Sequence, residues 1–429
     1  MPWRAAVRRQ LTRALGIGGP IALQRQMPGL NDMFKGIPAL GLYLHVPFCR
    51  QICPYCPYNK TLYRPKLAEA YAQAVIKEID LYASLLGPRP ITSFYIGGGT
   101  PTTMLQQGLP AILDHVARRF NLQCGIHMES HPNDLSVENL ATIQALGVDN
   151  LSIGVEALQD RHLRCLQRPY DVAQAQAAVE RAVKAGFTCL NADMIFALPG
   201  QTYGEVEEAG TRLLQWGVDQ IAAYPLFTFS YTAWSRLHQS HRAHFTVLQR
   251  RKMLSILEAV LYGAGFRRTS VWAFTRHGVP KYCSVTVPIY LGLGASGSSY
   301  LKDVFFVNTF NVPQYIAALE GGRPPIALSL ALSDRMQMAS WLYWRIYETR
   351  FRISDFRSRF GRDLWSVYGP WLALMECCRL LRRSGDHIIL SDCGAYWLHV
   401  LQDVFSTDYI SRLWGTAKAD PWPLRVILR

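Results

Sequence analysis

Residues 41–56 read Gly-Leu-Tyr-Leu-His-Val-Pro-Phe-Cys-Arg-Gln-Ile-Cys-Pro-Tyr-Cys. The first half predicts a mostly apolar strand, and the second half places Cys49, Cys53 and Cys56 with gaps of three and two residues. A structural zinc site takes four protein ligands, and iron–sulfur clusters are ordinarily held by four cysteines. Three thiols can hold three irons of a 4Fe–4S cluster and leave the fourth iron open. The spacing therefore predicts a reaction centre directly after a strand.

Strand-like and helical patterns alternate from residue 41 to about residue 265. The predicted strands are residues 41–48, 93–96, 125–129, 150–155, 189–198 and 220–227. The segments between them carry apolar residues at helical spacing. Six strand–helix units in series predict a parallel sheet with right-handed crossovers. The expected fold class is α/β, a partial (β/α)6 TIM-like barrel rather than a complete eight-stranded one.

The remaining segments suggest further domains around this barrel. The C-terminal part predicts helices over residues 333–359, 367–382 and about 395–405, with a hairpin that includes residues 388–390. This order is typical of a small α+β, winged-helix-like cap. The predicted domains are a basic N-terminal extension (1–40), the barrel (41–265), a short-strand extension with a glycine loop (266–328) and the C-terminal domain (329–429).

The net charge of +14 would suit nucleic acid, an anionic membrane surface or a polycarboxylate substrate. No aromatic-basic nucleic-acid motif is present, so we expect no nucleic-acid partner. No apolar run reaches the ~18 residues of a membrane span. Residues 1–31 hold five arginines and no acid, with Trp3, Val7, Leu11 and Leu15 at helical spacing. A frayed terminus, a transit-like leader and weak membrane-surface contact all remain open for this segment.

Seven further cysteines show no regular disulfide framework. We therefore expect a reducing compartment and a cytoplasmic protein. Cys377, Cys378 and Cys393 could form a second metal site, but buried thiols on a helix and a strand are the simpler interpretation.

Polar residues recur where the predicted strands end. The run Ile96-Gly-Gly-Gly-Thr-Pro101 follows the second strand, and its glycines would let the backbone approach a ligand closely. Later strands end in or contain the polar residues Glu129, Ser152, Glu156, Asn191 and Asp193. An acid within a buried strand is costly unless it is paired or bound to a ligand. Because barrel chemistry lies at the carboxyl ends of strands, we expect these side chains near Cys49. An ion pair between Asp193 and Arg168 is the structural alternative.

The thiol spacing, with Tyr55 before Cys56, resembles the radical S-adenosylmethionine (SAM) superfamily. The runs at residues 43–49, 97–101, 153–158, 193–202 and 290–294 resemble the oxygen-independent coproporphyrinogen III dehydrogenase family. That family also includes heme chaperones and C-methyltransferases. The resemblance covers roughly residues 40–410 and rests on several separate motifs.

The resemblance implies a cofactor set and a mechanism. A 4Fe–4S cluster on Cys49, Cys53 and Cys56 would bind SAM at its open iron and, once reduced, cleave it to a 5′-deoxyadenosyl radical that abstracts a substrate hydrogen. A small-molecule substrate such as a tetrapyrrole and an electron donor such as flavodoxin or ferredoxin are implied as partners. The residues that match SAM-contacting positions are Gly98, Gly99, Thr100, Glu129, Glu156, Arg168 and Asp193. Tyr43 matches a tyrosine beside the cluster and is the expected catalytic residue. Gly294 and Ala295 match a loop near a second SAM.

Two residues depart from the dehydrogenase pattern. Tyr58 stands where the dehydrogenases carry another cysteine, and an aromatic residue there is closer to the heme-chaperone branch. Glu156 stands where the family usually shows glutamine. His45 fits either a motif role or a strand histidine paired with the backbone. Radical oxidation, methyl transfer with two SAM molecules and heme binding therefore all remain open, and the substrate is not visible in the sequence.

Overall fold

Six parallel strands form the centre of the computed structural model, which describes residues 20–27, 29–30, 32–237, 245–282 and 287–428, with Arg8, Gln10 and Thr12 before them. The strands lie side by side in chain order. They are β2 (Leu40–Val46), β5 (Pro90–Gly98), β7 (Ile126–Ser130), β8 (Val148–Glu156), β9 (Cys189–Phe196) and β10 (Gln220–Pro225). Each overlaps a predicted strand, and the predicted fold class is confirmed.

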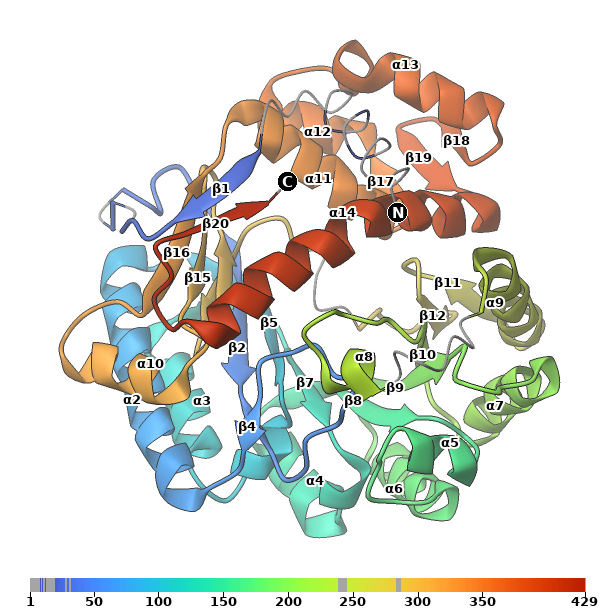
Figure 1. Cartoon of the computed structure of the whole chain (residues 1–429), viewed down its shortest axis with the longest axis horizontal. Coiled ribbons are helices and arrows are strands. Elements are labelled where there is room, and N and C mark those ends of the chain that lie inside the picture. The colour runs from blue at the N-terminus through green and yellow to red at the C-terminus, as the bar shows by residue number, and fades with distance from the viewer. Residues whose placement is uncertain are drawn as a thin grey trace.

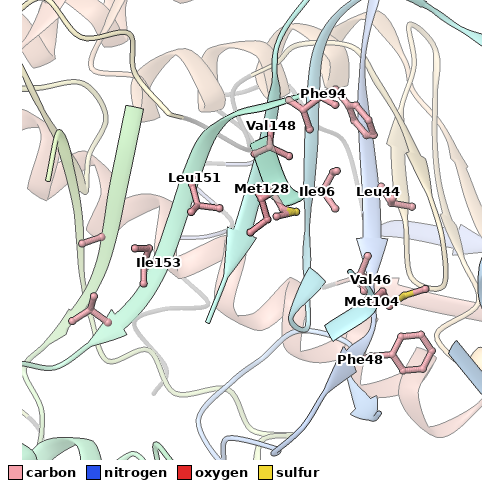
Figure 2. Packing of buried hydrophobic residues seen from close by; sticks show 14 of the residues in the cluster. Leu44, Val46, Phe48, Phe94, Ile96, Met104, Met128, Val148, Leu151 and Ile153 are labelled. Carbon is pink, nitrogen blue, oxygen red and sulfur yellow. The ribbon is translucent and has the colours of Figure 1, made fainter. Parts of the chain in front are cut away.

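Helices cover the outer face of this sheet (Figure 1). They are α2 (Pro65–Leu86), α3 (Leu109–Arg119), α4 (Val137–Ala145), α5 (Asp160–Cys165), α6 (Val172–Ala185), α7 (Tyr203–Gln215) and α9 (Val247–Gly263). The helices α6, α7 and α9 begin at capping boxes, in which the N-cap side chain and the third residue bond each other's backbone amides. Figure 2 shows the apolar side chains of successive strands, among them Leu44, Ile96, Met128 and Leu151, which are fully buried.

The sheet continues beyond the six strands at both edges. β12 (Ala273–Arg276) adds antiparallel to β10, and β11 (Phe266–Arg268) follows it. On the other side β13 (Tyr290–Leu293) runs parallel to β2, so β2 has parallel neighbours on both flanks. The strands beyond β13 are β14 (Ser298–Tyr300), β15 (Val304–Asn308), β16 (Ile326–Ala331), β1 (Ile21–Gln24) and β20 (Arg425–Leu428). α10 (Val312–Glu320) connects β15 to β16.

The C-terminal region has its own small sheet and core. α11 (Asp334–Tyr347), α12 (Ile353–Phe360) and α13 (Leu364–Cys377) pack around buried residues such as Trp341 and Phe356. β17 (Arg350–Arg352), β19 (His387–Leu390) and β18 (Leu381–Ser384) form a three-stranded sheet. The final helix, α14 (Asp392–Ala419), runs back across the barrel (Figure 1). The domain limits themselves stay a prediction.

Several details of the C-terminal prediction are wrong. Residues 333–359 are not one helix, because α11 ends at Tyr347 and Thr349 adopts φ +64° before β17 begins. α14 is much longer than the predicted helix near 395–405. Cys377, Cys378 and Cys393 are exposed rather than buried. No group of metal-ligating side chains that could hold a metal ion occurs in the described ranges, so no second metal site is found there.

The remaining sequence expectations concern segments at the margins. Trp3, Val7, Leu11, Leu15 and Cys283 lie outside the described residues. Within the part of the chain that the structure describes, no helix is both long and apolar enough to cross a membrane.

Candidate active site

The three cysteines lie on a loop that leaves the sheet directly after β2. β3 (Phe48–Cys49) pairs with β4 (Thr61–Leu62) in parallel, so both ends of the loop are held together. Cys49 is buried, whereas Cys53 and Cys56 are partly exposed, and all three thiols are free. The sequence prediction that the thiols follow the first barrel strand agrees with this placement.

The chemistry of the loop fits an iron–sulfur cluster. The three thiols are not arranged around one metal ion, and in a cluster each cysteine binds a different iron. Burial raises the pKa of Cys49 to about 12, so this thiol is protonated in the metal-free protein at neutral pH. Arg168 Nη1 lies 3.3 Å from Cys53 Sγ and Thr100 Oγ1 lies 3.6 Å from Cys49 Sγ. Arg168 and Thr100 can therefore donate hydrogen bonds to these two sulfurs once they are deprotonated.

The predicted glycine turn lies against the cysteine loop. The Gly99 amide donates to Val46 O (2.7 Å) and the Thr100 amide donates to Phe48 O (2.8 Å). Gly98 has φ +118°, and a Cβ there would lie 2.6 Å from the ring of His45. A Cβ on Gly99 would lie 2.7 Å from the Phe48 carbonyl oxygen. The protein's own packing therefore requires these glycines, whatever ligand the turn also binds.

Tyr43 and His45 form a hydrogen-bonded chain beneath the cysteine loop. His45 Nε2 lies 2.9 Å from the carbonyl oxygen of Asn59, which can only accept, so Nε2 carries the proton. His45 Nδ1 must then accept from the Tyr43 hydroxyl at 2.9 Å. Burial lowers the pKa of His45 to about 4, which keeps the ring neutral. The backbone-paired interpretation of His45 holds, and Tyr43 keeps only acceptor capacity for other groups.

Glu129 ends β7 beside the glycine turn. Its two carboxylate oxygens accept from the Tyr95 hydroxyl (2.7 Å) and the Gly98 amide (3.0 Å). Burial raises the pKa of Glu129, and the nearby charge of Glu156 raises it further. Glu129 therefore fixes the turn and lies close to the other acids of the site.

Asp193 is held by neutral donors rather than by a cation. Ser152 Oγ donates to Oδ2 (2.9 Å) and Asn191 Nδ2 donates to Oδ1 (3.0 Å). Burial, with the charges of Glu156 and Glu129, raises the pKa of Asp193 from 3.8 to about 8. No ion pair joins Asp193 to Arg168 among the described residues, so the structural alternative raised by the sequence is absent.

A ladder of polar side chains runs across the strands behind Asp193. Thr275 Oγ1 donates to Gln220 Oε1 (2.8 Å), and Gln220 Nε2 donates to Asn191 Oδ1 (3.1 Å). Asn191 Nδ2 also donates to Ser152 Oγ (2.7 Å). Ser152, Asn191 and Gln220 are paired in register on β8, β9 and β10. Gln220 and Thr275 were not singled out from the sequence, although an amide within an apolar strand is a signal that could have found the first.

Glu156 and Arg168 complete the same end of the sheet. Arg168 Nη2 donates to Gly154 O (3.0 Å) and Nε donates to the Tyr170 hydroxyl (2.8 Å). Glu156 is buried with φ +66°, an uncommon conformation for a residue with a side chain. Burial raises the pKa of Glu156 although Arg168 lowers it. The structure thus brings the predicted acids and Arg168 together with Cys53 at the carboxyl ends of the parallel strands. We call this end of the barrel the mouth.

The predicted loop for a second SAM is occupied by internal contacts. The Gly294 amide donates to Glu78 Oε2 (2.7 Å) and the Ala295 amide donates to the Tyr71 hydroxyl (3.0 Å). A Cβ on Gly294 would lie 2.3 Å from that hydroxyl. Glu78 is fully buried, and burial raises its pKa to about 7. Both amides therefore already have acceptors within the protein, and their predicted cofactor role stays a prediction.

Tyr58 and the end of α14 meet at the outer side of the cysteine loop. Tyr58 is 49% exposed, and its ring packs on Trp414 with centroids 5.9 Å apart. Lys418 Nζ donates to Pro57 O (2.8 Å) and Tyr58 O (3.1 Å). These contacts span more than 350 positions of sequence, so no local pattern could have predicted them.

Comparisons with known proteins agree with this geometry. Residues 43–213 match the Radical SAM superfamily. The heme chaperone HemW of Bacillus subtilis is 28% identical over 360 residues, covering 82% of this chain and 95% of that protein. The oxygen-independent coproporphyrinogen III oxidase of Synechocystis is 24% identical over 409 residues, covering 87% and 86%. The solved structure of coproporphyrinogen III oxidase (HemN) from Escherichia coli matches the fold with a TM-score of 0.78 at 20% identity, over 89% of this chain and 94% of that one.

Residues 43–213, which include the cysteine loop, thus resemble the Radical SAM superfamily, and most of the chain shares the fold of the HemN structure. Over most of its length the chain is similar to HemW and to the oxygen-independent coproporphyrinogen III oxidases. Radical SAM proteins use SAM and an iron–sulfur cluster, and the three free thiols of the loop could hold such a cluster.

Proposed function

We propose that this chain is an enzyme that binds a 4Fe–4S cluster and SAM and carries out radical oxidation of a tetrapyrrole-like, anionic substrate. The observation that carries the proposal is the contact between the cysteine loop and the turn after β5, at a mouth that also holds Glu129 and Asp193. When bound, the reduced cluster supplies the electron that cleaves SAM into methionine and a 5′-deoxyadenosyl radical.

The protein's residues bind and orient these groups. Cys49, Cys53 and Cys56 would hold the cluster, and the turn at 98–100 would receive the methionine part of SAM. Asp193 offers a carboxylate whose direction is fixed by two donors. Such prior orientation lowers the cost of binding, because little is left to order when the ligand arrives.

Cysteine substitution tests the cluster. We expect Cys49→Ala, Cys53→Ala and Cys56→Ala each to lose the visible absorption of cysteine-ligated iron–sulfur after anaerobic reconstitution, and to release no 5′-deoxyadenosine from SAM and reductant. Cys165→Ala is the matched control, because Cys165 lies on α5 outside the loop. Unchanged absorption in the three loop variants would contradict the proposal.

The type of radical reaction is tested by its products. Oxidation of a propionate-bearing substrate releases carbon dioxide, whereas methyl transfer produces S-adenosylhomocysteine and a heavier substrate. We expect carbon dioxide, because relatives that match most of this chain are named coproporphyrinogen oxidases. S-adenosylhomocysteine with a mass gain would instead assign methyl transfer with two SAM molecules.

Heme binding is the second candidate function. Tyr58 in place of the fourth cysteine favours it, as does the similarity to proteins named heme chaperone HemW. Heme titration of the pure protein separates the two functions. A saturable change in the Soret band, with no 5′-deoxyadenosine formed, would favour heme trafficking over catalysis.

A further inference from the structure

A cavity of about 480 Å³ lies on the outer side of the cysteine loop. Its walls come from the loop, from α8 (Ala233–Leu237), from the start of α10 and from the end of α14. Cys53 and Cys56 contribute to the wall, but Cys49 and the turn at 98–100 do not. Glu129 and Asp193 do not line the cavity either, so the cavity and the mouth share the cysteine loop but not the acids.

Three cationic side chains face this cavity. Lys60 comes from the cysteine loop, Arg236 from α8 and Lys418 from α14. Among the described residues, no Asp or Glu lines the cavity, and none forms an ion pair with these three. The N-terminus of α10, at residues 311–313, adds the positive end of a helix to the same wall. The cavity is therefore a concentration of uncompensated positive charge.

The two lysines are held in place by the cysteine loop itself. Lys418 Nζ donates to the carbonyls of Pro57 and Tyr58, and Lys60 Nζ donates to the carbonyls of Cys56 and Tyr58. The Lys418 ammonium also lies 4.6 Å from the centroid of the Tyr231 ring. An ammonium has three donors, so each lysine keeps a donor for a ligand. Holding the cations close together beforehand lowers the entropic cost of binding an anion.

The size and lining of the cavity favour a small organic anion over a protein. Small-molecule pockets commonly measure roughly 300–1,000 Å³ and combine apolar walls with a few polar groups. Phe310 and Tyr231 supply aromatic wall beside the three cations. A ring compound that carries carboxylates matches both features.

We propose that this cavity binds carboxylate groups of a small polyanion through Lys60, Arg236 and Lys418. The identification of that ligand as the enzyme's substrate rests on the proposed function, whereas the anion site itself does not. A substrate anchored here would contact the loop that carries the cluster ligands.

Porphyrin binding to the full-length chain tests the site without SAM or reductant. The probe is coproporphyrin III, a tetracarboxylate whose fluorescence reports binding, and its tetramethyl ester is the uncharged control. We expect Arg236→Gln to weaken coproporphyrin binding about tenfold, the effect of one charged hydrogen bond, and Arg236→Glu to weaken it further. Citrate should compete, and the ester should bind much less tightly than the acid.

Arg382→Gln is the matched control, because Arg382 is exposed on β18 in the small C-terminal sheet. Lys60→Gln and Lys418→Gln should also weaken binding, with circular dichroism to confirm that they fold. Equal affinity of the wild type and Arg236→Glu, or equal binding of acid and ester, would overturn the proposal. The proposal would also be overturned if these variants lost flavodoxin binding but kept porphyrin binding. The cavity would then belong to a protein-docking surface. If the charge variants bind porphyrin more weakly as expected but the wild-type protein cannot cleave SAM, the anion site stands and only the proposed function is rejected.

Discussion

Gly98 ends β5 and Gly294 directly follows β13, the two strands that flank β2, and the two turns are built alike. Both glycines have positive φ, +118° and +90°. The Gly98 amide donates to a carboxylate oxygen of Glu129 at 3.0 Å, and the Gly294 amide donates to one of Glu78 at 2.7 Å. Both turns also touch His45, which presents its ring to Gly98 and its carbonyl to Gly294.

The two carboxylates differ in what surrounds them. Glu78 comes from α2 and is fully buried, with Asn308 and Tyr315 as further donors. Glu129 comes from β7, is only partly buried, and lies close enough to Glu156 to feel its charge. The same backbone arrangement therefore serves packing in one turn and faces the mouth in the other. A glycine motif specifies the turn geometry, and only the environment of the carboxylate identifies a ligand site.

Alanine at the two glycines gives the largest expected difference. In Gly294→Ala the new Cβ would lie 2.5 Å from the His45 carbonyl oxygen. This oxygen cannot move away, because His45 belongs to β2, which is paired with a strand on each side. We expect a loss of about 3 kcal/mol or more in the free energy of unfolding. In Gly98→Ala the obstacle is the His45 ring, and we expect about 2 kcal/mol. Urea unfolding of the metal-free protein measures both, and a larger loss for Gly98→Ala would reverse the comparison.

Glutamine at the two acids separates packing from ligand binding. The groups that bond Glu78 are donors, so the amide nitrogen of Glu78→Gln meets donors in a buried site. We expect a loss of about 2 kcal/mol in unfolding free energy at pH 8 and an unchanged Kd for SAM. Glu129→Gln should show a smaller stability loss and about a tenfold weaker Kd for SAM. Isothermal titration of the reconstituted protein measures the Kd, and weaker SAM binding in both variants would contradict the distinction.

The sequence predicted the barrel well because its signals are local. Each predicted barrel strand is present, and acids such as Glu129 and Asp193 recur at the ends or in the second halves of parallel strands, so their gathering follows from topology. The partners of these acids could not be predicted. Glu78 meets Gly294 across 216 positions of sequence, and short strands such as β1 and β20 carry no periodic pattern. Contacts of this kind depend on the tertiary fold and leave no mark in the local sequence.

Asp193 makes the pH dependence of the mouth testable. Its pKa is raised from 3.8 to about 8 in the folded protein. Between these values the unfolded chain has released the proton and the folded chain keeps it, so the wild type loses stability as pH rises towards 8. Asp193→Asn cannot lose this proton. We expect its stability advantage over the wild type to grow by about 2 kcal/mol from pH 6 to pH 8 in the metal-free protein and then to level off. Thermal melts across this range measure it, and a constant gap would show that Asp193 is ionised throughout.

The smallest expected effects concern His45, the residue shared by the two turns. Tyr43→Phe removes the hydroxyl that donates to His45 Nδ1 on the Gly98 side. Tyr71→Phe removes the donor to the His45 carbonyl (2.6 Å) and the acceptor for the Ala295 amide on the other side. We expect about 1 kcal/mol for the first and about 2 kcal/mol for the second, since the second breaks two buried bonds.

An NMR titration of His45 distinguishes the two sides more sharply than stability does. The Tyr43 hydroxyl donates to Nδ1 of the neutral ring and would have to reorient to accept from the protonated ring, so its loss should shift the His45 pKa from its value of about 4. Tyr71 bonds the backbone carbonyl rather than the ring, so Tyr71→Phe should leave that pKa in place. If both variants shift the pKa equally, the two turns are coupled through His45, and a change at the Gly294 turn affects the mouth. If only Tyr43→Phe does, the two turns share a residue but act independently.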